Sequence, residues 1–217
     1  NASLHTHTHT HTHTHTGAKG DDIMMLNMEN YIDTVSQPAC CLGITGASHV
    51  PFKHGQKYPK HRTENMPANM SAYLNCLTFT DSCIGHLVQH VYSHEATKNT
   101  TIVITGDHTV FRTEYKDINE YARMNNYAFR TPKTCTPLII YSPHIEKNSY
   151  VTDTCYQMDI YPTILSVLGL EDYYWYGVGA NLTDSISFSN RQINEGDAYE
   201  YSDWLIRSNY FVKYKEN

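Results

Sequence analysis

The stretch Thr101-Ile-Val-Ile-Thr-Gly-Asp-His108 decides the fold. Its first five residues are all β-branched and Gly106 ends the run, a pattern that predicts a short strand buried on both faces. Strands of this kind are typical of parallel sheets, in which ligands bind at the loops that follow the carboxyl ends of the strands. Asp107 and His108 stand at that point in the sequence.

These two residues are candidate metal ligands. They offer a carboxylate oxygen and an imidazole nitrogen, which are ligand types of Zn, Mn and Mg sites. The spacing alone leaves an alternative open, because Asp often closes a turn and His often packs in a core. A catalytic ion also takes three or more protein ligands as a rule, so Asp107 and His108 do not complete a site by themselves.

Two further apolar runs are predicted to be strands of the same sheet. Residues 39–45 form one of them, and the loop that follows carries His49. Residues 137–141 form the other. Because the carboxyl ends of parallel strands meet at one edge of a sheet, we expect His49 to line the same cavity as Asp107 and His108.

Helices are predicted between these strands from apolar residues at helical spacing. The pattern favours helices over residues 24–35 and 67–97. A third helix is predicted to begin at Asp159 as its N-cap, with Pro162 in the first turn and Gly169 as the stop signal. We interpret Asp159 as a capping residue and not as a catalytic one.

The rest of the chain has weaker signals. Residues 53–65 and 109–134 are polar without periodicity and are predicted to be loops, and residues 198–214 alternate enough to supply strands. The order of elements therefore predicts an α/β fold, with a mainly parallel sheet covered by helices on both faces and a small C-terminal antiparallel element.

Composition narrows the function classes. The chain has 217 residues, 40% of them hydrophobic and 18% charged, which is typical of a globular domain. Its net charge is −6 and its 16 Lys and Arg are scattered, which argues against a nucleic-acid surface. The sequence contains no apolar stretch long enough to cross a membrane and no targeting signal.

Residues 5–16 alternate His and Thr without a break. The histidines would share one face of an extended segment, so metal binding is one interpretation. A low-complexity tract, disordered or tag-like, is the favoured one, because it has too little apolar surface to fold. We therefore divide the chain into this tract, residues 1–20, and one domain, residues 21–217.

The segment 101–108 closely resembles the metal-binding strand of the alkaline phosphatase superfamily, specifically its sulfatase and lipoteichoic acid synthase-like branch. Within residues 37–52, Gly-Ile-Thr-Gly-Ala-Ser-His-Val-Pro resembles the strand that ends in a substrate-contacting histidine. Three other segments occur in the family order: residues 73–85, 136–143 and 158–169. The resemblance spans about residues 21–184.

The resemblance implies a role for each candidate residue. Asp107 and His108 would bind one divalent ion, with Mn, Mg, Ca and Zn all open, and His49 would donate to the phosphate or sulfate of a substrate. The implied activity is a metal-dependent hydrolase or transferase of phosphate or sulfate esters, phosphoglycerol transfer included. Substrates would be lipids or glycans. The parent protein would be membrane-anchored and located on the extracytoplasmic side of a membrane, periplasmic or extracellular.

One departure from the family pattern qualifies this expectation. The family nucleophile, a Thr, Ser or Cys-derived residue, lies in the N-terminal half of the domain, and nothing before Asp21 matches that half. The sulfatase signature Cys-x-Pro-x-Arg is absent as well. We therefore expect the C-terminal half of a catalytic domain, inactive when isolated. The alternative is a non-catalytic binding or structural remnant of the same fold.

Overall fold

The computed structural model describes residues 20–53, 65–108, 116–124, 136–152, 155–170 and 179–184, together with Glu200, Asp203 and Arg207. The chain divides into two compact units. Unit 1 comprises residues 1–97 and 110–132, and unit 2 comprises residues 98–109 and 133–217. The His-Thr tract lies outside the described residues.

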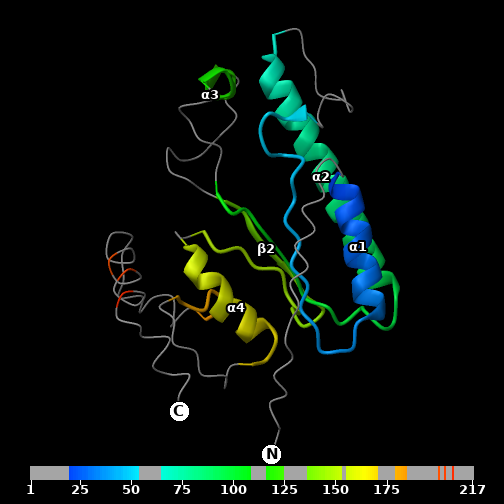
Figure 1. The fold of residues 1–217 in the computed structure, drawn as a ribbon. Helices are drawn as coiled ribbons and strands as arrows, with labels where there is room; N and C mark the ends of the chain where they lie inside the picture. The colour runs from blue at the N-terminus through cyan, green and yellow to red at the C-terminus, as the bar shows by residue number, and fades with distance from the viewer. Residues whose placement is uncertain are drawn as a thin grey trace, which may run out of the picture. The chain divides into compact units, whose positions relative to one another are not determined.

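Unit 1 is built on two helices that pack side by side, α1 (Asp21–Thr34) and α2 (Ala68–Ser93) (Figure 1). Both were predicted from their periodicity and are confirmed. The buried face of α2 contributes Met70 and Cys76 to a core cluster with Phe52. The ring of Phe52 lies 5.3 Å from that of Tyr73, measured between centroids. This cluster attaches Phe52 to α2.

A third helix, α3 (Lys116–Met124), lies within the segment that was predicted to be a loop, so that prediction was wrong. Its Tyr121 packs against the cluster of Phe52. Ile118, Tyr121 and Ala122 stand at i, i+3 and i+4 in the sequence, which is the apolar spacing of a helix. Only one turn carries that spacing, and the flanking residues are polar, so the signal was weak.

Residues 39–45 are not a strand, although they were predicted to be one. From Cys41 to Thr45 the residues alternate between half-buried and exposed: Leu42 is 83% and Ile44 is 73% exposed. Gly43 lies against the Met28 side chain of α1, where a Cβ would collide with the sulfur. The apolar run therefore has the period of a strand, but within the described residues no neighbouring strand pairs with it.

Unit 2 contains the strand formed by the deciding stretch. β1 (Ile102–Thr105) pairs with β2 (Leu138–Tyr141), so both strands were predicted correctly. The pairing is antiparallel, with Ile102 opposite Tyr141 and Thr105 opposite Leu138, which corrects the expectation of a parallel pair. Ile139 and Tyr141 are each more than half exposed, so one face of β2 is solvated, as antiparallel sheets allow.

The last described helix ends as its sequence predicts. The 3₁₀ turn η2 (Gln157–Asp159) leads into α4 (Ile160–Val167), with Pro162 in the first turn. Gly169 has φ of +68°, a left-handed conformation that glycine adopts without steric cost. The N–H of Leu170 donates to the carbonyl of Leu165, and that of Gly169 to Ser166, which is a Schellman motif.

Asp159 precedes α4 at the N-cap position, but its carboxylate does not cap that helix. It is completely buried and accepts hydrogen bonds from the N–H of Tyr156 at 2.7 Å and of Ala180 at 2.8 Å. Its carboxylate instead caps η2, in a capping box with Tyr156, so the capping interpretation holds for η2 and is corrected for α4. Asp159 thus joins the backbone at Tyr156 to the backbone at Ala180, 24 positions later in the chain.

Little of the C-terminal tail is described. Glu200, Asp203 and Arg207 are helical, where residues 198–214 were predicted to form strands. Arg207 Nε lies 2.6 Å from Asp203 Oδ2, an ion pair at the i, i+4 spacing of a helix. None of the helices within the described ranges is long and apolar enough to cross a membrane.

Candidate functional site

Asp107 and His108 lie directly after β1, as predicted, with Gly106 between strand and pair. Asp107 Oδ1 accepts a hydrogen bond from the N–H of His108 at 2.9 Å. Asp107 Oδ2 lies 3.7 Å from His108 Nε2. The side chains are 82% and 53% exposed, so a solute can reach both.

The loop that carries this pair is held by a residue that sequence reasoning missed. Gln157 of η2 donates from Nε2 to the carbonyl oxygen of Gly106 at 3.1 Å and to that of Asp107 at 2.9 Å. Gly106 itself is tightly placed, because a Cβ there would lie 3.1 Å from Thr136 Cγ2. Gln157 therefore holds the backbone of Gly106 and Asp107, and Thr136 packs closely against Gly106.

The pair fits part of a divalent-ion site. One carboxylate oxygen and one imidazole nitrogen lie close enough to bind the same ion, at the usual ligand distances of about 2.0–2.2 Å. Across the described ranges, no three His, Cys, Asp or Glu side chains converge in a geometry able to hold a metal ion. Asp107 and His108 thus supply two donors, and a complete site requires others.

His49 lies in a tight turn that follows residues 39–45. Its N–H donates to the carbonyl of Gly46 at 3.1 Å, and its own carbonyl accepts from the N–H of Phe52 at 3.1 Å. The ring Nδ1 lies 2.8 Å from the carbonyl oxygen of Val50. Since a carbonyl only accepts, this contact places the proton of the neutral ring on Nδ1.

This tautomer has a chemical consequence for His49. With Nδ1 donating to Val50, Nε2 of the neutral ring can only accept a hydrogen bond. Nε2 becomes a donor when the ring takes up a second proton, and the side chain is then a cation. The exposed imidazole of His49 can therefore bind an anion through Nε2 in its protonated form.

The expected convergence of the three candidates stays a prediction. His49 belongs to unit 1, whereas Asp107 and His108 belong to unit 2. The structure does bring Asp107 and His108 together, and it places His49 at an exposed turn.

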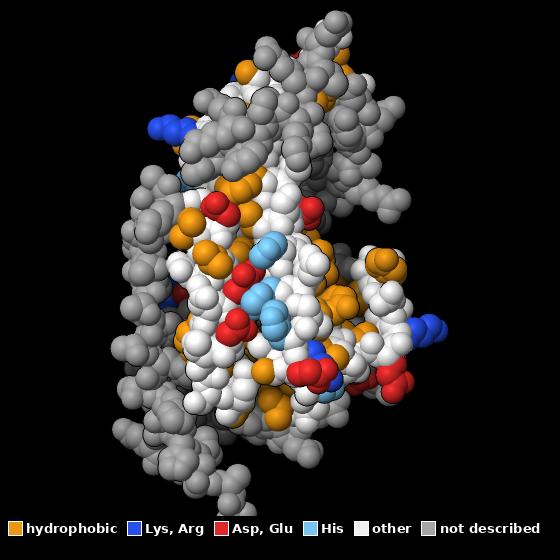
Figure 2. Space-filling model, turned by 90° about the vertical axis from the view of Figure 1, so that its right-hand side faces the viewer, with side chains coloured by type: hydrophobic (Ala, Val, Ile, Leu, Met, Phe, Trp, Pro, Cys, Tyr) orange, Lys and Arg blue, Asp and Glu red, His pale blue; other side chains and the backbone are white. Residues whose placement is uncertain are grey.

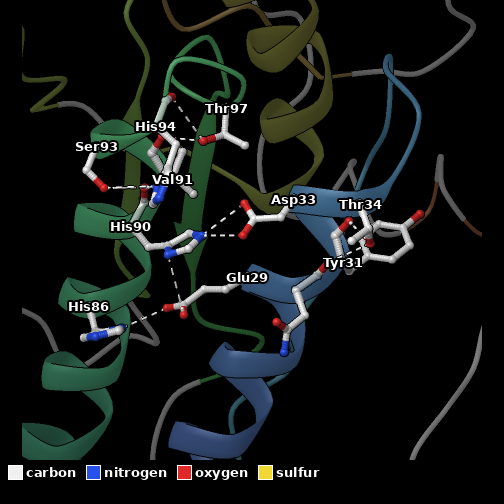
Figure 3. Close-up of polar contacts among 11 residues, drawn as sticks. Glu29, Tyr31, Asp33, Thr34, His86, His90, Val91, Ser93, His94 and Thr97 are labelled. Carbon is white, nitrogen blue, oxygen red and sulfur yellow. Dashed lines mark hydrogen bonds and ion pairs between the residues drawn. The ribbon is translucent and has the colours of Figure 1, made fainter.

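A second polar cluster lies on α1 and α2, and sequence reasoning missed it as well. Figure 2 shows histidine and acidic side chains gathered on one face, and Figure 3 shows Glu29 between two histidines. Glu29 Oε1 lies 2.9 Å from His86 Nδ1, and Glu29 Oε2 lies 3.8 Å from His90 Nδ1. His90 Nε2 is 3.1 Å from both carboxylate oxygens of Asp33. The spacing of the histidines, i and i+4 on one helix, was a visible signal.

This cluster joins the two helices instead of forming a metal centre. The Glu29 side chain is only 6% exposed, and its partners are imidazoles. The ring of His94 packs on that of His90, with centroids 4.5 Å apart. These side chains lie within the described part of the chain, where no group of three or more His, Cys, Asp or Glu could hold a metal ion. We therefore assign it to the packing of α1 on α2.

Comparisons with known proteins identify the family of this chain. The family model described as Sulfatase matches residues 3–170. A protein named Sulfatase from Formosa agariphila is 29% identical over 104 residues, covering 48% of this chain and 19% of that protein. Arylsulfatase K of Canis lupus familiaris is 26% identical over 113 residues, covering 52% of this chain and 19% of that protein.

The chain thus spans about a fifth of the length of these curated relatives, with 19% of each one covered. No solved structure matches it. The match of the family model extends over more than half of the chain and includes His49, Asp107 and His108. β1 is half-buried, and not buried on both faces as predicted. On the match of the family model over residues 3–170, the chain belongs to the sulfatase family, whose fold is the α/β fold of the alkaline phosphatase superfamily.

Proposed function

We propose that this chain forms part of a metal-dependent sulfate-ester hydrolase. In this proposal Asp107 and His108 are two ligands of the divalent ion, and His49 binds the sulfate group. The observation that carries it is the exposed Asp107–His108 pair, whose donor atoms lie 3.7 Å apart at the end of β1 in a sulfatase-family chain.

The residues suit the charge of the substrate. A sulfate ester carries a negative charge that grows on its oxygens as the ester bond breaks, and a bound divalent ion would neutralise part of it. Asp107 and His108 contribute by holding that ion. Gln157 contributes by fixing the backbone of Gly106 and Asp107, so that the two ligands keep their positions.

In this proposal His49 binds the sulfate group directly, through a hydrogen bond from its side chain. Its Nδ1–H is already engaged by Val50, which orients the ring. The protonated imidazole then presents Nε2–H to a sulfate oxygen, as a charge-assisted hydrogen bond. We assign no nucleophile to this chain, and residues 21–217 are proposed to be a part of the catalytic domain.

The finer assignments are also proposals. The likeness of residues 101–108 to the sulfatase and lipoteichoic acid synthase-like branch supports phosphate esters, and phosphoglycerol transfer in particular, as the second candidate reaction. Lipid or glycan substrates, a membrane-anchored parent and an extracytoplasmic location follow from the same likeness. The choice among Mn, Mg, Ca and Zn is left to metal replacement.

The experiment compares an aryl sulfate, an aryl phosphate and a phosphodiester as substrates. The protein is the longest product of the gene with residues 1–20 deleted, because the histidines of residues 5–16 bind transition ions whatever the fold does. We expect hydrolysis of the aryl sulfate that a chelator abolishes and one of the four ions restores.

If the protein prefers the phosphodiester, the proposal of sulfate-ester hydrolysis fails and the second candidate reaction takes its place. Absence of hydrolysis, together with absence of specific ion binding by calorimetry, would favour the non-catalytic alternative. A His49→Ala variant, expected to lose about 10²–10³-fold in rate, checks the third residue of the site.

A further inference from the structure

Asp21, the first residue of α1, has a buried carboxylate with three hydrogen bonds. Asp21 is only 3% exposed. Its Oδ1 accepts from the N–H of Gly46 at 2.8 Å and from that of Ala47 at 3.1 Å. Its Oδ2 accepts from the hydroxyl of Thr80, on α2, at 2.6 Å. One side chain thus joins α1, α2 and the loop after residues 39–45.

The partners of this carboxylate are all neutral donors. Among the described residues they are two backbone amides and one hydroxyl, without a Lys or Arg side chain. A buried charge is tolerated only where such hydrogen bonds are short and complete, and each is stronger than a bond between neutral groups. The N-terminus of α1 adds a favourable partial charge. The positions of Gly46 and Ala47 are therefore strongly determined.

These two amides begin the turn that carries His49. The N–H of His49 donates to the carbonyl of Gly46, so the residue bound by Asp21 also closes the turn. Ala47 is 1% exposed, two residues before the exposed His49. Asp21 therefore fixes the amino-terminal end of the turn.

The carboxyl-terminal end of the turn is fixed independently. Phe52 is 2% exposed, and its N–H donates to the carbonyl of His49. Its φ is +58°, a left-handed conformation that a bulky residue rarely adopts. Burial of the ring against Tyr73 accounts for its position. His49 is thus the exposed residue between two buried attachments, Ala47 and Phe52.

We infer that Asp21 is a positioning residue for His49. It holds the turn from Gly46 to His49 through its carboxylate, and Thr80 orients that carboxylate from α2. The consequence for substrate binding rests on the proposed function, because it requires that His49 binds the sulfate group. The positioning itself does not depend on catalysis and has a readout of its own.

The first experiment tests the positioning without any assay of activity. Amide hydrogen exchange of Gly46 and Ala47 is measured by NMR in the wild-type chain and in Asp21→Asn. Asn keeps the shape of Asp and removes its charge. We expect exchange at both amides to accelerate at least 10-fold, with the interior amides of α2 unchanged. Asp22→Asn, an exposed neighbour on the same helix, is the matched control and should leave both amides as they are.

The second experiment asks whether Asp21 acts through His49. A double-mutant cycle combines Asp21→Asn with His49→Ala, and kcat/KM for an aryl sulfate is the readout. We expect Asp21→Asn to lose about 10–100-fold alone, the range for residues that orient a functional group. In the His49→Ala background, the same substitution should lose less than about 3-fold, because there is no imidazole left to position.

The outcomes separate the two claims. Equal losses in both backgrounds would make Asp21 a structural residue only and overturn the inference. If His49→Ala itself has no effect, the proposed role of His49 fails, and the exchange of the Gly46 and Ala47 amides still decides whether Asp21 holds the turn. Unchanged exchange in Asp21→Asn overturns the inference whatever the activity. Should Asp21→Asn fail to fold, Thr80→Val, with Thr80→Ser as its control, replaces it in both experiments.

Discussion

Gln157 Nε2 lies 2.9 Å from the carbonyl oxygen of Asp107, a hydrogen bond between residues 50 positions apart. The same nitrogen lies 3.1 Å from the carbonyl oxygen of Gly106. The backbone before His108 therefore depends on a side chain from the turn that leads into α4. This relationship connects the position of the candidate metal ligands to the second half of unit 2.

Replacing Gln157 should weaken metal binding. Gln157→Ala removes both hydrogen bonds and leaves the side chains of Asp107 and His108 in place. We expect the affinity for a divalent ion to fall about 10-fold, the lower end for residues that orient ligands. Isothermal titration calorimetry on protein without residues 1–20 measures it. Gln89→Ala, an exposed glutamine of α2, is the control, and an equal effect there would refute the role of Gln157.

Asp159 should be needed for the stability of unit 2. Asp159→Ala removes the carboxylate that accepts from the buried amide of Ala180 and from the half-buried amide of Tyr156, and a buried amide that loses its acceptor costs roughly 1–3 kcal/mol. The free energy of unfolding, from urea denaturation followed by circular dichroism, should fall accordingly. Glu146→Ala, at an exposed carboxylate, should change it by less than about 0.5 kcal/mol. A similar small change for Asp159→Ala would contradict the buried network.

The thiol of Cys83 should react slowly. Burial, with the nearby carboxylates of Asp21 and Asp22, raises its pKa from 9.0 to about 11. At pH 8 this shift lowers the thiolate fraction by about 100-fold relative to an ordinary cysteine, and the thiolate is the reactive form. Labelling with iodoacetamide, followed by peptide mass spectrometry, should modify the exposed Cys40 first. Equal rates at Cys40 and Cys83 in folded protein would be inconsistent with this environment.

The same shift gives stability a pH dependence. Because the folded state holds the proton of Cys83 more tightly than the unfolded state, the contribution is fully present below about pH 9 and is lost as the pH rises toward 11. Cys83→Ser should reduce this loss when unfolding is measured across that range.

The histidines of α2 should differ in their importance for packing. The side chain of His90 is 19% exposed and contacts both Glu29 and Asp33, whereas that of His86 is 72% exposed and contacts Glu29. His90→Ala should cost about 1–3 kcal/mol of unfolding free energy, because the buried carboxylate of Glu29 loses a partner, as does the exposed carboxylate of Asp33. His86→Ala should cost less than about 1 kcal/mol. Thermal and urea unfolding of the two variants provide the comparison, and the reverse order would refute it.

The sequence was sufficient for the elements with regular periods. The apolar spacing in α1 and α2 predicts helices, and Gly169 marks the end of α4 because its left-handed φ suits glycine. The direction of β2 relative to β1 was not predictable, because an apolar run can form a strand in a parallel or in an antiparallel pair. Residues 39–45 are an apolar run like those of β1 and β2, yet a strand also requires a partner, which the local sequence does not encode.

The candidate site likewise contains residues that the sequence predicted and residues that it did not. Asp107, His108 and His49 were found because each follows an apolar run. Gln157 and Asp21 were not found, because the groups that they bind lie at least 25 residues away and are mostly backbone atoms, which leave no side-chain pattern. The exception is the Thr80 hydroxyl, 59 residues from Asp21. Residues that bind through their own side chains can be read from a motif, whereas residues that hold a loop become visible in the structure.

The most direct test of the central claim is the rate of ion-dependent hydrolysis of an aryl sulfate by Asp107→Ala. The assay uses the longest gene product without residues 1–20, with Asp81→Ala, an exposed carboxylate of α2, as the control. Loss of one ligand should remove the several kcal/mol that the ion contributes, so we predict a decrease of at least about 10³-fold. The control should keep the wild-type rate. Retention of the wild-type rate by Asp107→Ala would contradict the assignment of Asp107 as a metal ligand, and with it the proposed site.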